Sequence, residues 1–118
     1  GLVTTRRFLK ANEDVVRRFL SAHIEAAARA QKDKPYALKM MRKYFRTDDR
    51  ELLEESYELV LKSGMDFPPY PAGIANVLLG IEDQIPKAKG ANPEDFVDSR
   101  LVRELDQNGF IRSVLASR

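Results

Sequence analysis

The chain has 118 residues, which is enough for one hydrophobic core and too few for two. Hydrophobic residues make up 43% and charged residues 32%, and this balance excludes a disordered segment. The 20 basic side chains nearly match the 18 acidic ones, so the net charge is only +2 and no polyanionic partner such as nucleic acid is implied, despite a pI near 9.0. Without cysteine, disulfides, thiolate nucleophiles and zinc-thiolate sites are excluded.

The sequence shows neither a membrane-spanning segment nor a recognisable targeting signal. No apolar run approaches the ~18 residues that a spanning helix needs, so we expect no membrane insertion. The opening Gly1-Leu2-Val3-Thr4-Thr5 lacks the charged-then-apolar plan of a signal peptide. If the protein is exported, its signal lies outside this chain.

The first elements in chain order are a short strand and two helices. Residues 1–5 favour extended backbone, and they are the only stretch that does so. A short helix from Arg6 to Lys10 is predicted to end near Asn12, whose side chain would cap a longer helix running to about Gln31. On a helical wheel the longer helix has one broad apolar arc, predicted to face the core: Val15, Val16, Phe19, Leu20, Ala22, His23, Ala26, Ala27 and Ala30.

Two more helices follow before residue 64. Asp33 is predicted to cap the first, with Pro35 in its opening turn, and Asp48 with Glu51 has the capping-box spacing for the second, which Gly64 would end. Their predicted core residues are Tyr36, Met40, Met41, Tyr44 and Phe45, then Leu52, Leu53, Tyr57 and Val60.

The last third begins with a proline-rich loop, Met65 to Pro71. We then expect a helix from about Ala72 that stops before Pro86, and a loop over 87–91. Asn92 starts a short turn through Val97, and a helix from Asp98 closes at Asn108-Gly109 before a final turn. The predicted core positions are Ile74, Leu78, Ile81 and Ile85, then Leu101, Val102, Leu105, Phe110, Ile111, Val114 and Leu115. The fold class is therefore mainly α, a single segment over residues 1–118 with at most one short N-terminal strand.

Candidate reactive residues are few, and we assign none of them a catalytic role. His23 is the only histidine, and its place in the apolar arc favours a partly buried structural residue over a base or metal ligand. Glu54, Glu55 and Glu58, like Glu82 and Asp83, are interpreted as solvated helix faces. The basic groups Arg6, Arg7, Arg17, Arg18, Lys39, Arg42 and Lys43 would meet phosphates only if the fold gathered them. Pro68-Pro69-Tyr70 has the wrong order for an adaptor ligand and is interpreted as a structural loop.

Several segments together resemble one protein family. They are Thr4-Thr5-Arg6-Arg7-Phe8-Leu9-Lys10, Asp14-Val15-Val16-Arg17-Arg18-Phe19-Leu20, Pro69-Tyr70-Pro71 before Gly73 to Leu79, Asn92-Pro93-Glu94-Asp95-Phe96-Val97-Asp98, Val102-Arg103-Glu104-Leu105-Asp106 and Gly109-Phe110-Ile111. In this order they resemble the C-terminal third of substrate-binding proteins of the nitrate, sulfonate and taurine class of ABC importers. The chain departs from the pattern at Glu13, where relatives often have proline.

The resemblance implies a function as well as a parent fold. Proteins of that family are periplasmic or otherwise extracytoplasmic, and two α/β lobes close on a small anionic or heterocyclic solute for delivery to the permease. This chain would supply helices that cover the sheet of the first lobe, with the remainder of the protein as its partner and no independent ligand site. Thr4 and Thr5, near the hinge, are the only residues carried over as ligand contacts. No enzymatic activity, cofactor or metal is expected.

An isolated set of sheet-covering helices would expose the apolar face that normally meets strands. We therefore expect the chain alone to form homo-oligomers, by dimerising or exchanging helices. Two alternatives remain open: a self-standing helical interaction module that uses the Phe67 to Pro71 loop or an apolar groove, and a weak nucleic-acid binder.

Overall fold

The computed structural model of the protein describes residues 2–62 and 71–116, and within them it confirms a mainly α fold. No strand occurs in these two ranges, so the strand expected at the N-terminus is wrong for residues 2–5. Those residues lack a partner segment with which to form a β-ladder, although Thr5 has extended backbone angles (φ −83°, ψ 150°).

Helices α1 (Arg6–Ala11) and α2 (Glu13–Lys32) meet at a single junction residue. Thr5 starts α1, because its Oγ1 accepts a hydrogen bond from the Phe8 N–H. Asn12 was expected to cap α2 with its side chain, and this is wrong. Its Nδ2 instead donates to the Phe8 carbonyl, since the residue also ends α1 and its side chain bonds back to that helix.

Helices α3 (Lys34–Phe45) and α4 (Arg50–Lys62) form a hairpin at the end of α2. Asp33 caps α3 as predicted, accepting from the Tyr36 N–H at 3.0 Å. The capping box predicted for α4 is shifted by one residue: Asp49 accepts from the Leu52 N–H, while the Asp48 carboxylate is paired with Arg42.

The C-terminal half contains α5 (Pro71–Ile81), two 3-10 turns, η1 (Pro86–Ala88) and η2 (Pro93–Phe96), and then α6 (Arg100–Gln107) and α7 (Phe110–Ala116). Helix α5 ends at Ile81, earlier than expected, because the chain turns so that Gln84 and Ile85 both donate to the Ile81 carbonyl. The loop predicted over 87–91 begins inside η1. Asn92 and Gly109 act as predicted: Asn92 caps η2, and Gly109 takes a positive φ of 82° between α6 and α7.

The main core lies between α2 and the α6/α7 pair. Its buried members are Ile24, Val102, Leu105 and Ile111, with Leu20, Phe110 and Val114 packed against them. Two ion pairs hold the same elements together at the surface, Arg17 with Glu104 at 2.9 Å and Arg100 with Glu13 at 3.6 Å.

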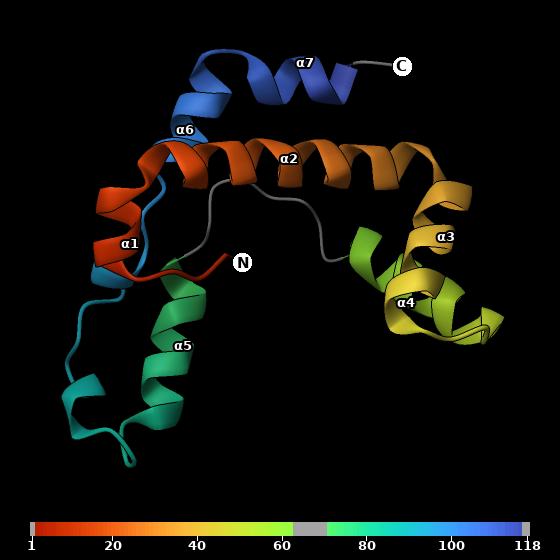
Figure 1. The fold of residues 1–118 in the computed structure, drawn as a ribbon. Coiled ribbons are helices and arrows are strands. Elements are labelled where there is room, and N and C mark those ends of the chain that lie inside the picture. Colours follow the sequence, from red (N-terminus) through yellow and green to blue (C-terminus); the bar gives the residue numbers. More distant parts are fainter. Residues whose placement is uncertain (1, 63–70, 117–118) are drawn as a thin grey trace.

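Figure 1 shows α2 as a crossbar from which the other elements extend. Helices α6 and α7 cover one side of α2. The other helices lie on the opposite side, α3 and α4 near one end of α2 and α1 and α5 near the other. Helix α5 packs mainly against η1 and η2. The radius of gyration is 17.0 Å, whereas a compact domain of this length has about 13.5 Å. The chain is therefore more open than an ordinary single domain.

In the described parts of the chain, every helix is too short or too polar to cross a lipid bilayer.

Candidate interaction surface

Helix α2 exposes the side that its sequence predicts to be buried. Val15 and Phe19 are 45% and 55% exposed, and Ala22, His23 and Ala26 are exposed as well. We call these five residues the open face of α2. The buried residues of the helix are instead Ile24 and Ala28, at 1% and 2% exposure, and at 100° per residue they lie on roughly the opposite side.

The prediction is wrong for the centre of the arc but right for Leu20, which packs against the core, because the helix carries apolar residues on both sides. Its stronger apolar arc was assigned to the core, but α6 and α7 pack on the narrower arc around Ile24. Arg17 tolerates this position because its Nη2 reaches Glu104 at the surface, although its Nε is buried without a hydrogen-bond partner. The open face therefore remains a largely uncovered apolar surface, which among the described residues only the N-terminal segment contacts in part.

The open face continues into a small apolar groove. Residues 2–4 lie against Val15, Val16 and Phe19 and enclose about 90 Å³. Val3 points almost wholly into solvent, at 95% exposure. The N-terminal segment thus widens the apolar surface of α2 instead of closing it.

Apolar side chains are exposed on the other elements too. Tyr44, Phe45, Leu52, Val60, Ile85 and Leu115, all predicted to be in the core, are each at least 45% exposed. The other large apolar residues with this exposure outside the open face are Leu2, Val3, Phe8, Leu59, Val77, Leu79 and Phe96.

The total surface gives the size of the uncovered area. The accessible surface is 9414 Å², whereas a compact monomer of 13.5 kDa has about 6500 Å². The excess of about 2900 Å² is more than three times the ~800 Å² that each partner buries in a standard protein interface. The chain therefore exposes more surface than a compact domain of its mass.

His23 is exposed on the open face, so its expected partial burial is wrong. Among residues 2–62 and 71–116, no three histidine, cysteine or acidic side chains are grouped as metal ligands would be.

Two of the acidic residues are not simply solvated as predicted. Glu54 and Glu58 of α4 bind Lys34 of α3 at 2.7 and 3.3 Å. These hydrogen bonds, first that of Glu54 and then that of Glu58, raise the pKa of Lys34. These ion pairs join α3 to α4, and the hydroxyl of the buried Tyr57 joins α4 to α2 by donating to the Ala30 carbonyl.

The predicted basic groups are only partly gathered. Arg17 and Arg18 are paired with acidic side chains, and Arg6 donates to the Asp95 carbonyl. Lys39, Arg42 and Lys43 do lie together, at the end of α3 around a separate hollow.

The two threonines carried over as ligand contacts lie beside the open face. Thr4 lines the apolar groove, and the Thr5 hydroxyl is engaged in capping α1. Their proposed contact with solute stays a prediction. The predicted Met65 to Pro71 loop lies outside the described residues except for Pro71, which begins α5.

No family model, curated protein or solved structure was found to match the chain.

Proposed function

We propose that this chain is the helical C-terminal part of an extracytoplasmic solute-binding protein that serves an ABC importer of the nitrate, sulfonate and taurine class. In this proposal α2 lies against a β-sheet supplied by the remainder of the protein. The solute, a small anion or heterocycle, binds only when the remaining lobes are present. The chain itself carries out no turnover.

The observation that carries the proposal is the open face of α2. Helices that cover a sheet need an apolar side for the strands and a second side for neighbouring helices. Helix α2 has both, because α6 and α7 pack around Ile24 while Val15 and Phe19 stay exposed on the other side. The colinear resemblance described above connects this arrangement with the solute-binding proteins.

The test uses one substitution in two contexts. Phe19→Glu in the protein encoded by the complete reading frame should place a charge against the sheet and lower its stability by several kcal/mol. In the isolated chain the same change removes an exposed apolar group and should leave the helical content intact, with less association. Equal behaviour in the two contexts would count against burial of this face in a parent protein.

Ligand binding provides an independent measurement. Nitrate, taurine and aliphatic sulfonates should be screened by thermal shift against the complete protein, because a bound solute raises the unfolding temperature. The isolated chain should show no shift with any of these solutes. A saturable shift in the isolated chain would contradict the absence of an independent site.

The apolar groove of Leu2, Val3, Val15, Val16 and Phe19 supports a second candidate, a self-standing helical interaction module. Its volume of about 90 Å³ and apolar lining suit a single apolar side chain of another protein. A complete reading frame that encodes only this helical segment would favour the module, whereas preceding α/β sequence and a signal peptide would favour the receptor.

A further inference from the structure

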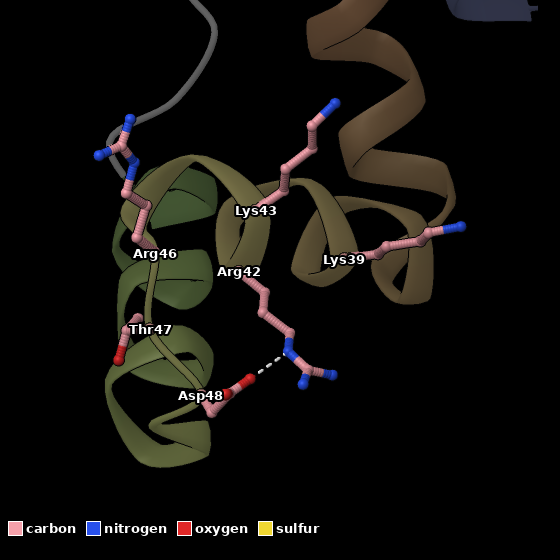
Figure 2. A pocket seen from close by; sticks show the side chains of 6 residues that line it. All are labelled: Lys39, Arg42, Lys43, Arg46, Thr47 and Asp48. Atoms are coloured by element: carbon pink, nitrogen blue, oxygen red, sulfur yellow. Dashed lines mark hydrogen bonds and ion pairs between the residues drawn. The ribbon is translucent and has the colours of Figure 1, made fainter.

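The C-terminal end of α3 carries a hollow surrounded by positive charge. Lys39, Arg42 and Lys43 come from the helix, and Arg46, Thr47 and Asp48 come from the turn that follows (Figure 2). We call this set the basic hollow. Its volume is about 320 Å³, at the lower end of the range found for small-molecule sites.

The charges of the basic hollow are not balanced. Four cationic side chains and one carboxylate line the hollow, and Asp48 pairs with Arg42 alone, while Lys39, Lys43 and Arg46 point away from it (Figure 2). Within the part of the chain that the structure describes, Lys39, Lys43 and Arg46 have no acidic partner. This contrasts with Arg17, Arg18, Lys34 and Arg100, each of which is paired with a carboxylate.

The geometry of Arg42 leaves hydrogen-bond donors available. Its Nε atom makes the contact with Asp48, so the two terminal nitrogens of the guanidinium point onward into solvent (Figure 2). A guanidinium held in this way presents donors suited to a phosphoryl oxygen. Asp48 thus fixes the orientation of Arg42 while neutralising only one of the four positive charges.

Helix stability explains only part of this cluster. Arg42 and Lys43 lie in the last turn, where cations interact favourably with the helix dipole. Lys39 lies a turn earlier. Arg46 has a left-handed backbone (φ 54°), a conformation that glycine adopts at lower cost, yet the position carries a long cationic side chain.

We propose that the basic hollow binds a multivalent phosphate-bearing anion, with Lys39, Arg42, Lys43 and Arg46 as its cationic contacts. The excess of positive charge favours an anion with several negative charges over a single carboxylate. The long lysine and arginine side chains point in different directions (Figure 2), and in this proposal they turn inward around the phosphoryl groups. This site is separate from the open face of α2, and the proposal does not depend on the receptor function.

The experiment measures pyrophosphate binding to the chain by isothermal titration calorimetry at low ionic strength. The test variant is Lys39→Gln/Lys43→Gln. The matched control is Lys87→Gln/Lys89→Gln, which makes the same change in net charge at two exposed lysines that do not line the hollow. We expect one pyrophosphate site per chain. The affinity for pyrophosphate should fall about tenfold or more in the test variant and stay unchanged in the control. Circular dichroism should show the same helical content in all three proteins, because the four lysines are exposed.

Sedimentation with vesicles separates a lipid headgroup from a soluble phosphate compound. Vesicles with a phosphoinositide in phosphatidylcholine should bind the wild type and not the test variant if the natural phosphate is on a lipid; binding of pyrophosphate alone indicates a soluble ligand. Equal loss of pyrophosphate binding in the test and control variants would overturn the proposal, because general charge would then explain it. Absence of pyrophosphate binding, or tighter binding of random duplex DNA than of pyrophosphate, would overturn it too.

Discussion

Replacing Phe19 by glutamate tests whether the open face of α2 drives self-association. The side chain is 55% exposed, so a phenylalanine of about 200 Å² leaves roughly 110 Å² in water. At about 25 cal/mol per Å², covering that area contributes about 3 kcal/mol for each copy of the residue. Both copies in a homodimer carry the substitution, so two such contributions are lost and association weakens by about ten-thousandfold.

Sedimentation equilibrium of the isolated chain measures this effect directly. We expect the wild type to form dimers or larger species at micromolar concentration and Phe19→Glu to remain monomeric over the same range. Gln107→Glu is the control, because it introduces the same charge at an exposed position of α6. A wild type that stays a compact monomer at high concentration would refute the reasoning, since the open face would then be covered within one chain.

Four other substitutions test the packing and the electrostatics. Ile24→Ala should lower the free energy of unfolding by about 2–4 kcal/mol in urea titrations, because Ile24 is fully buried between α2 and α6/α7; a loss below ~1 kcal/mol would contradict that core. Tyr57→Phe should cost about 1 kcal/mol in the same assay, through loss of the hydrogen bond to Ala30, and no change would argue against that contact. Gly109→Ala should lower the thermal midpoint, because a side chain at φ 82° is strained by about 1 kcal/mol, and an unchanged midpoint would disagree with this turn. The hydrogen bond from Arg100 lowers the pKa of Asp98, so the ionised carboxylate contributes to stability above the unfolded-state pKa, and this contribution is lost as the pH falls below ~4. Asp98→Asn lacks the contribution, so it should lose less stability than the wild type between neutral and acid pH. Parallel losses in the two proteins would exclude the contribution.

Local signals in the sequence predict most helix boundaries. Asp33, Asn92 and Gly109 each act within a few residues through a side-chain cap or a positive φ, so their roles can be inferred without knowledge of the tertiary structure. The capping of α4 shows the limit of such signals. Asp48 and Asp49 are neighbours of the same type, and the sequence alone does not distinguish the one that caps α4, Asp49, from the one that contacts Arg42, Asp48.

The buried side of α2 could not be predicted in the same way. Periodicity identifies an apolar arc, but it does not distinguish a side that meets helices from one that is left open. Leu101, Val102 and Leu105 were assigned correctly because α6 has a single apolar side. Helix α2 has two, and its packing was decided by residues about eighty positions later in the chain.

The basic hollow was missed because its residues were assessed as separate charges. Lys39, Arg42 and Lys43 were recognised as cations whose grouping depended on the fold, but Arg46 was not included with them. Arg46 joins the hollow because it takes a left-handed conformation at the end of α3, which turns the chain back toward the last turn of the helix. The clue in the sequence is a long cationic side chain at a helix end where glycine is common.

The open face and the basic hollow differ in the kind of partner that each would bind. The hollow is lined mostly by exposed charged side chains, whose burial is not needed for folding. The open face is apolar, so a partner that covered it would remove side chains such as Val15 and Phe19 from water. If a parent protein covers α2 as proposed, hydrogen exchange in α2 and α4 should be faster in the isolated chain than in the protein encoded by the complete reading frame. Slow exchange of these helices in the isolated monomer would mean that the packing around Ile24 and Tyr57 is sufficient on its own.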